Sequence, residues 1–358
     1  MDNLSLPVLL LIFAAAVAAV WVAGTYLATT TDVLAQRFGL GEALGGLILL
    51  ALVTNLPEIA ITVSAALRHD LGIATGNILG GIAIQTVVLV LLDFFGLGKA
   101  AALTYRAASL VLVLEGILVI AVLTVAVIGS QMPATLVFAG VTPAGLLIFL
   151  LWVAGLWLIG KARTDLPWQE RAAKGADGRP ETQGRTRSQR KKKEGARPKN
   201  GSTTKAVLVF LAGGAVTLVA GVVLERGGNA IAGRIGMSGV LFGATVLAAA
   251  TSLPELSTGL ASTKLGDYQL AISDIFGGNA FLPVLFLVAS LISGESVLPH
   301  AQKIDIYLTA LGILLTAVYL YGLIFRLERQ IVRMGLDSFV VLVLYAVGVL
   351  GLFAIAAN

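Results

Sequence analysis

Long apolar runs, separated by short polar segments, occupy most of the chain. Each run has about 20 residues or more, which is the length that lets an α-helix cross the hydrocarbon core of a bilayer. The pattern predicts ten helices, near residues 6–27, 40–67, 71–95, 108–129, 134–160, 205–225, 238–264, 268–293, 304–326 and 338–356. The expected fold class is therefore an all-α membrane protein with ten transmembrane helices.

One long segment interrupts this pattern. Residues 161–204 are polar, contain a run of three lysines, and offer little apolar sequence to bury, which is typical of a disordered or loosely structured linker. The linker divides the chain into a first unit, 1–160, and a second unit, 205–358, with five predicted helices each. Five is an odd number, so the second unit enters the membrane with the opposite polarity, and we expect two inverted-topology repeats.

Composition supports the membrane class and excludes several kinds of site. The chain is 57% hydrophobic and 13% charged, with a mean hydropathy of +0.92, whereas soluble domains have about 25% charged residues. The absence of cysteine excludes disulfides and thiolate metal sites, and two histidines do not favour a transition-metal centre. Most of the net charge of +5 lies in the linker, so it indicates membrane topology and not a nucleic-acid partner. No enzyme motif is found, and no cofactor is expected.

Basic residues predict the orientation. With the linker in the cytoplasm, both chain ends lie outside, and short-loop basic residues gather on the linker's side, as the positive-inside rule requires. Those on the linker's side are Arg37, Lys99, Arg106, Lys264, Arg326, Arg329 and Arg333, against Arg68, Arg226, Arg234 and Lys303 outside. The linker is expected to touch anionic headgroups. The compact size favours a prokaryotic plasma membrane.

A short stretch occurs twice, in register. Residues 54–58 read Thr-Asn-Leu-Pro-Glu and residues 251–255 read Thr-Ser-Leu-Pro-Glu, and 19 positions after each Glu stand Asn77 and Asp274. One offset of 197 positions maps the first copy onto the second. A carboxylate at membrane depth indicates function by default. Interrupted helices at matching positions of inverted halves indicate a transport site near the bilayer midplane.

The two prolines explain what such a stretch can bind. Pro57 has no N–H and its ring clashes with the preceding turn, so the carbonyl of Val53 loses its helical partner and that of Thr54 is loosened. Free carbonyls at membrane depth must face protein, water or an ion. Two carboxylates with several carbonyls form an all-oxygen cage, which suits a hard divalent cation such as Ca2+. Glycines after each glutamate indicate close helix packing.

At these residues the chain resembles the sodium/calcium exchanger family, within the cation/calcium antiporter superfamily. The two alpha-repeats of that family carry Gly-Thr-Ser-Leu-Pro-Glu followed by Gly-Asn-x-x-Gly-Ser, and the resemblance covers about 40–95 and 238–293. It implies that Glu58 and Glu255 bind calcium. It also implies that backbone carbonyls of other residues contribute, to calcium from Thr54 and Thr251, and to flanking monovalent sites from Ala51 and Ala248.

The sequence departs from the family pattern at positions that mostly serve sodium. The family has Ser 23 positions after each Glu, where this chain has Gly81 and Gly278. It has Asn or Asp 27 positions after each Glu, where this chain has Gln85 and Leu282. The calcium pair is kept and the sodium ligands are depleted, which puts sodium coupling in doubt.

Several polar residues are secondary candidates for the flanking ion sites. Asp274 stands where the motif usually has Asn; it either approaches the cavity or contacts water or a lysine near a helix end. Asn77, Gln85 and Asn279 are also candidates for these sites, and Asn279 is expected to line the cavity. Glu115, within the fourth apolar span, is either a proton carrier or a partner for a loop cation.

The leading functional hypothesis is secondary active transport. The protein would exchange Ca2+ or a similar divalent ion for Na+ or H+ by alternating access, with Glu58 and Glu255 binding each ion type in turn. The first and sixth helices would move against a core formed by the central helix pairs. The alternatives are a passive cation channel and a membrane regulatory protein that moves no ions. The sequence does not predict an oligomeric state.

Overall fold

The computed structural model describes residues 1, 4–37, 49–97, 101–138, 141–162 and 203–356, and these are almost entirely helical. The elements of the first half are α1 (Leu6–Arg37), α2 (Leu49–Thr54), α3 (Leu56–Leu67), α4 (Leu71–Gly96), α5 (Leu103–Ala107), α6 (Leu110–Ser130) and α7 (Pro143–Ala162). Those of the second half are α9 (Thr203–Ile235), α10 (Gly239–Phe242), the π-helical η2 (Gly243–Leu247), α11 (Ala248–Thr251), α12 (Leu253–Leu265), α13 (Tyr268–Phe281), η3 (Leu282–Val284), α14 (Leu285–Ser293), η4 (Leu298–His300), α15 (Lys303–Phe325), β1 (Gln330–Ile331), β2 (Met334–Gly335) and α16 (Leu336–Ala356).

The described residues contain nine helical segments that are long and apolar enough to cross a membrane. Six of the ten predicted helices match one of these segments with small shifts, and the predicted helices 6–27, 134–160 and 205–225 match α1, α7 and α9 with one end displaced by about ten residues. The predicted helix 40–67 is described from Leu49 onward, as the two shorter helices α2 and α3. The all-helical membrane class is confirmed, whereas the count of ten extends beyond the described residues. The linker predicted at 161–204 also lies outside them, apart from its edges.

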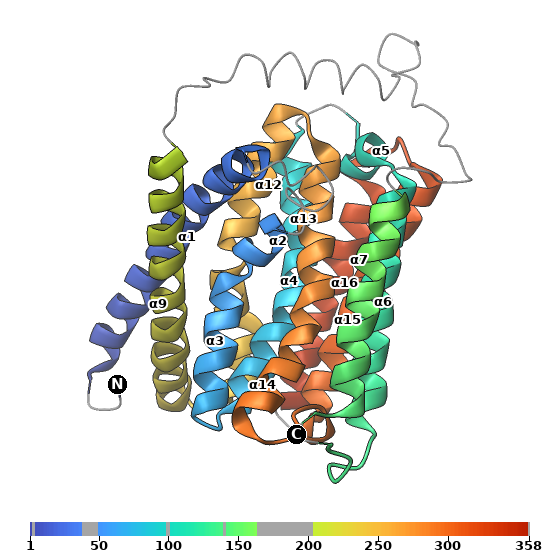
Figure 1. Cartoon of the computed structure of the whole chain (residues 1–358). Helices are drawn as coiled ribbons and strands as arrows, with labels where there is room; N and C mark the ends of the chain where they lie inside the picture. The colour runs from blue at the N-terminus through green and yellow to red at the C-terminus, as the bar shows by residue number, and fades with distance from the viewer. Residues whose placement is uncertain (2–3, 38–48, 98–100, 139–140, 163–202, 357–358) are drawn as a thin grey trace.

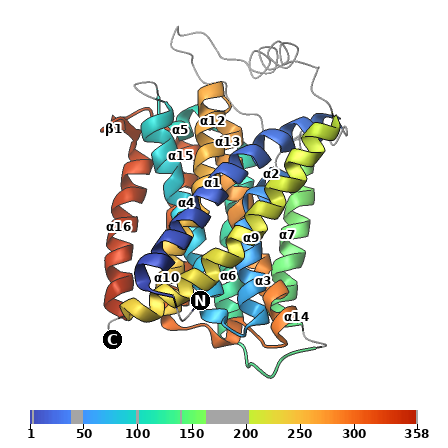
Figure 2. The same cartoon turned by 90° about the vertical axis from the view of Figure 1, so that its left-hand side faces the viewer.

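The two halves are arranged in opposite directions. In Figure 1, α3 lies toward the lower end of the bundle and its counterpart α12 toward the upper end. The ends of α7 and α9 that flank residues 163–202 lie at the upper end, here called the linker side, and both chain termini lie at the opposite end, called the far side. The long helices α1 and α9 lie side by side along one flank (Figures 1 and 2).

Three helix ends differ from the predicted ones. α7 begins at Pro143 and not at residue 134, because the preceding segment forms an antiparallel bridge between Phe138 and Val141. Proline has no N–H to satisfy in the first turn of a helix, so it is a favourable place to start. α1 continues to Arg37, beyond the predicted end at residue 27, and α9 continues to Ile235, beyond the predicted end at residue 225. Glu225 is tolerated inside α9 because it packs, fully buried, against another helix.

Small residues let the two halves interlock. A side chain at Gly76 would overlap the backbone of Val240, and one at Gly80 would overlap the backbone of Ala244. α4 of the first half therefore crosses α10 and η2 of the second half at backbone contact. This close crossing holds the two repeats together beside the interrupted helices.

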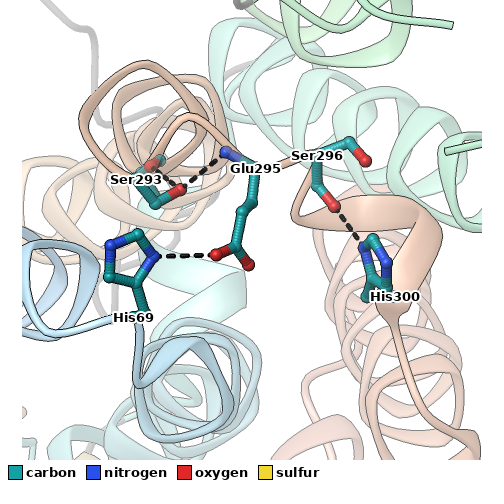
Figure 3. Close-up of polar contacts among 6 residues, drawn as sticks. His69, Ser293, Glu295, Ser296 and His300 are labelled. Atoms are coloured by element: carbon teal, nitrogen blue, oxygen red, sulfur yellow. Dashed lines mark hydrogen bonds and ion pairs between the residues drawn. The ribbon is translucent and has the colours of Figure 1, made fainter. Parts of the chain in front are cut away.

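Loops close both ends of the bundle. On the linker side, Asp93 of α4 accepts hydrogen bonds from the backbone N–H groups of Leu103 (2.9 Å) and Gly335 (2.6 Å), which joins segments from both halves. On the far side, His69 and Glu295 form an exposed contact of 2.7 Å between Nδ1 and Oε1, again between the halves (Figure 3). The contacts of Asp93 are buried and the contact between His69 and Glu295 is open to water, so we expect the two to contribute differently to the free energy of unfolding.

Asp93→Ala is expected to lower the free energy of unfolding by about 3 kcal/mol, because two buried N–H groups lose their charged acceptor. Glu295→Ala is the matched control, since an exposed ion pair contributes about 0–1 kcal/mol. Denaturant unfolding in detergent, followed by tryptophan fluorescence, measures both variants. Equal stability of the two variants would contradict the fastening role of Asp93.

Candidate ion-binding site

Both repeated stretches interrupt their helices at the same place. α2 gives way to α3 at Asn55, and α11 gives way to α12 at Ser252, which is the equivalent position in the second half. Each interruption is held by side chains that fold back on the preceding turn. The carbonyl of Ala51 accepts from Nδ2 of Asn55 at 2.6 Å, and the carbonyl of Ala248 accepts from Oγ of Ser252 at 2.8 Å. The predicted role of these two carbonyls as ion ligands stays a prediction, and here both accept protein hydrogen bonds.

The two predicted glutamates are buried and their carboxylates lack hydrogen-bond partners. Glu58 is 0% exposed and Glu255 is 1% exposed. Among the described residues, none donates a hydrogen bond to any of the four carboxylate oxygens. Glu58 lies beside Thr251, but that hydroxyl donates to the carbonyl of Ala248. Unpaired buried carboxylates are very unfavourable, so these oxygens require a cation or protons.

The structure brings the two halves of the motif together. The carboxylate of Glu255 interacts electrostatically with those of Glu58 and Asp274, so three acidic groups share one region. Glu255 also lies beside Thr54, just as Glu58 lies beside Thr251. Each glutamate, in the first turn of α3 or α12, thus meets the threonine that ends α11 or α2 of the opposite repeat.

Asn77 and Asp274 occupy equivalent places across this region. The hydroxyl of Thr251 lies 3.5 Å from Oδ1 of Asn77, and the hydroxyl of Thr54 lies 3.5 Å from Oδ1 of Asp274. Both polar side chains are buried. The sequence allowed Asp274 to be either a cavity residue or a helix-end residue that contacts water or a lysine. In the structure its side chain lies among the residues of the repeated motif.

The second repeat adds a partner for Asp274 that the first repeat lacks. Oδ2 of Asp274 accepts from the hydroxyl of Thr258 at 2.7 Å. The equivalent position in the first half is Ile61, whose side chain offers no donor. In the second half, the carboxylate of Asp274 therefore has a hydroxyl donor. In the first half, Nδ2 of Asn77 has no hydrogen-bond partner among the described residues.

The positions where the family carries sodium ligands are filled differently in each half. A methyl group at Gly278 would come within 2.7 Å of Nδ2 of Asn55, whose Oδ1 accepts from Nε2 of Gln85 at 3.3 Å. The amides of Asn55 and Gln85 therefore fill the space beside Gly278. In the other half, Gly81 faces Leu282, whose Cδ1 would lie 3.6 Å from such a methyl group. The space beside Gly278 thus holds amide groups, and the space beside Gly81 holds an apolar side chain.

The remaining candidates lie at the edge of this arrangement. Nδ2 of Asn279 donates to the hydroxyl of Thr86 at 3.2 Å and approaches the carbonyl of Ile82 at 3.4 Å, so it links α13 to α4. Its predicted role in lining an ion site stays a prediction. Glu115 is 5% exposed in α6, and its role likewise stays a prediction.

Comparison with known proteins identifies the family. The family model described as sodium/calcium exchanger protein matches residues 8–159 and 205–354, which is nearly the whole of both halves. The chain belongs to this family of ion exchangers. Members exchange Ca2+ for Na+ or H+ and need no bound cofactor, so the chain is a multi-pass membrane transporter and not an enzyme. The resemblance carried by the repeated motif is confirmed.

Individual relatives agree with this assignment. The inner membrane protein YrbG of Escherichia coli K12 is 27% identical over 276 residues, which are 76% of this chain and 77% of YrbG. Among solved structures, the sodium–calcium exchanger NCX_Mj superposes with a TM-score of 0.59 at 18% identity, covering 97% of this chain and 99% of that one. The H+/Ca2+ exchanger CAX superposes with a TM-score of 0.57 at 15% identity, covering 97% and 87%. These superpositions show a shared fold.

Two residues near the glutamates were not among the sequence candidates. Thr258 lies three residues after Glu255, so both point to the same face of α12, and this spacing was a usable signal. Asn55 stands within the motif, where the family has serine, and the larger side chain was a hint that it fills a gap. The gap lies beside Gly278, on another helix, and no local sequence pattern predicts it.

Proposed function

We propose that the protein exchanges Ca2+, or a similar divalent cation, for a monovalent cation, and that Glu58 and Glu255 bind both in turn. The observation that carries this proposal is the pair of buried carboxylates whose four oxygens have no hydrogen-bond donor among the described residues. Two negative charges balance one divalent ion. Hard oxygen ligands suit Ca2+, which accepts six to eight of them at flexible geometry. Backbone carbonyls of Thr54 and Thr251 complete the proposed cage.

Protons are the better candidate for the coupling ion. A flanking sodium ion needs several oxygen ligands. Leu282, which packs against Gly81, supplies none, and beside Gly278 the amide of Asn55 fills space while Gln85 offers one unpaired amide oxygen. The carbonyls of Ala51 and Ala248 already accept hydrogen bonds. A proton needs no such cage, because a carboxylate can take it directly. We therefore expect transport driven by a pH gradient more strongly than by a sodium gradient.

Alternating access would use the pair α1 and α9. A side chain at Gly24 of α1 would come within 2.7 Å of Pro254, and one at Gly221 of α9 would come within 3.0 Å of the carbonyl of Pro57. Gly24 and Gly221 are equivalent positions. Each of the two flanking helices thus slides against the interrupted helix of the opposite half, and its movement opens the glutamates to one side at a time.

Flux into proteoliposomes tests this proposal. Calcium uptake is measured while the sodium gradient and the pH gradient are set independently, at a clamped membrane potential. Uptake that follows the opposing pH gradient is the expected result. Uptake that follows a sodium gradient alone would overturn the choice of coupling ion. Uptake that needs no opposing gradient would indicate a passive channel, and absence of uptake for every divalent ion would indicate a membrane protein without transport activity.

The charge of Asp274 is expected to strengthen divalent binding. Asp274→Asn should raise the calcium concentration for half-maximal binding about tenfold, because one negative charge close to Glu255 is lost in a region of low dielectric constant. Asn77→Asp is the matched variant in the other repeat and should change binding in the opposite direction. Isothermal titration in detergent measures both, and equal affinity of Asp274→Asn and the parent would place Asp274 outside the binding site.

The proposed location is a prokaryotic plasma membrane, with the linker in the cytoplasm and the far side outside. The basic residues of the short loops support this orientation, and the relative YrbG is named as an inner membrane protein. Impermeant labelling of single cysteines placed on each side measures the orientation directly, since the chain has no cysteine of its own.

A further inference from the structure

A buried polar cluster ties α9 to α3 near the far side. Glu225 of α9 is 0% exposed. Its Oε2 accepts from the hydroxyl of Ser64 at 2.8 Å, and its Oε1 lies 3.5 Å from Nη1 of Arg68. One turn further along α9, the amide of Asn229 donates to a carboxylate oxygen of Asp70. Two successive turns of α9 are thus attached to the end of α3.

This cluster is unusual for a position inside a membrane helix. A buried carboxylate is costly unless it is paired and hydrogen-bonded. Here Oε2 accepts a hydrogen bond from Ser64 of α3, and Oε1 is in an ion pair with Arg68, which directly follows α3. Arg226 and Asp70 are the other charged groups that act on Glu225. If α9 moved away from α3, Glu225 would lose both partners while remaining in a region of low dielectric constant. Separation at this end is therefore opposed by more than apolar packing.

The equivalent contact in the other half is absent from the sequence. The positions that correspond to Glu225, Ser64 and Arg68 are alanine 28, alanine 261 and leucine 265. These apolar residues carry no charge. Among the described residues, α1 and α12 are joined instead by an exposed hydrogen bond of 3.2 Å between the hydroxyls of Thr25 and Ser257. The two pairs of helices are related by repeat symmetry, but a buried charged contact is described for α9 and α3 alone.

We propose that Glu225 is a positioning residue that fastens α9 to α3 and favours the state of the transporter in which the far side is closed. This inference rests on the proposed movement of α1 and α9, though not on which ions are exchanged. Glu225 acts through Ser64 and Arg68 and does not touch the transported ion. Without bound ions, the transporter would then open more readily on the linker side.

Distance measurements between two spin labels test this inference. The labels are attached through Leu67→Cys at the end of α3 and Ile235→Cys at the end of α9, which are 68% and 50% exposed and lie on the far side. Without calcium, we expect mainly one short distance. Glu225→Ala should increase the ratio of the longer to the shorter distance about tenfold, since a hydrogen bond to a charged group and an ion pair are lost.

Three further variants make the result specific. Ser64→Ala should increase the same ratio by a smaller factor, and Glu225→Gln should fall between the parent and Glu225→Ala, because the amide oxygen still accepts from Ser64. Glu295→Gln breaks an exposed contact at the same end and should change nothing. Should Glu225→Ala fail to fold, Ser64→Ala and Glu225→Gln decide. Unchanged distance ratios in the Glu225 variants and in Ser64→Ala would overturn the inference, whether or not calcium exchange is observed.

Discussion

Glu58→Gln and Glu255→Gln are each expected to reduce calcium exchange by at least about 100-fold. Glutamine has nearly the shape of glutamate, so the packing around the side chain is kept, but the negative charge is lost and N–H donors enter the oxygen cage. Removing even an outer partner of a metal ligand costs about 10–100-fold in affinity, and a direct ligand should cost more. Initial rates of calcium uptake into proteoliposomes measure the effect.

Stability measurements separate a lost ion site from a damaged fold. Calcium at 100 times its dissociation constant should stabilise the parent protein by about 2.7 kcal/mol, because it binds the folded state alone. Both glutamine variants should lose this stabilisation, while their stability without calcium is kept or increased, since an unpaired buried carboxylate has been removed. Glu295→Gln, at the exposed contact with His69, serves as the control that retains both uptake and stabilisation. Full uptake in either site variant would refute the assignment of the glutamates.

Gly80→Ala is expected to destabilise the fold strongly. A methyl group at this position would overlap the backbone of Ala244, so α4 and η2 would have to move apart. Backbone atoms cannot rotate away as a side chain can, and overpacking in a well-packed core costs about 1–3 kcal/mol or more. We expect a loss of about 3 kcal/mol in the free energy of unfolding.

The adjacent glycine provides a matched control for this prediction. At Gly81 a methyl group would lie 3.6 Å from Cδ1 of Leu282, which is an ordinary van der Waals contact. Gly81→Ala should therefore change stability by less than about 0.5 kcal/mol. Denaturant unfolding in detergent compares the two variants. Equal effects would show that helix propensity, and not the crossing with η2, determines the outcome.

Much of this architecture could be predicted from the sequence because membranes impose strong rules. The apolar runs predicted the helices, and the prolines next to Glu58 and Glu255 predicted the interruptions, since proline removes a backbone donor wherever it stands. Helix ends were less predictable. The predicted helix 205–225 ended at Glu225, because the sequence does not show that Ser64 and Arg68 approach this carboxylate and make its burial acceptable.

Side-chain partners across helices were the least predictable part. The position of Gly278 within the motif revealed a missing serine, but not that the amide of Asn55 fills its place. Likewise, Asp274 could be read as a cavity residue or as a helix-end residue, and the hydroxyl of Thr258 beside it follows from how α12 packs on α13. Such partners depend on approach distances between segments far apart in sequence, which no local pattern contains.

The hydrogen bond from Asn279 to the carbonyl of Ile82 has a consequence for the energetics of the transport cycle. These two residues are 197 positions apart, so each is the repeat equivalent of the other, and they meet where the two halves are related by their approximate symmetry. If the halves exchange roles, the separation of these two backbone positions is kept, because each position takes the place of the other. A substitution at Asn279 should therefore change the free energies of both end states alike and alter the speed of interconversion, whereas off-axis differences between the halves determine which end state is more populated.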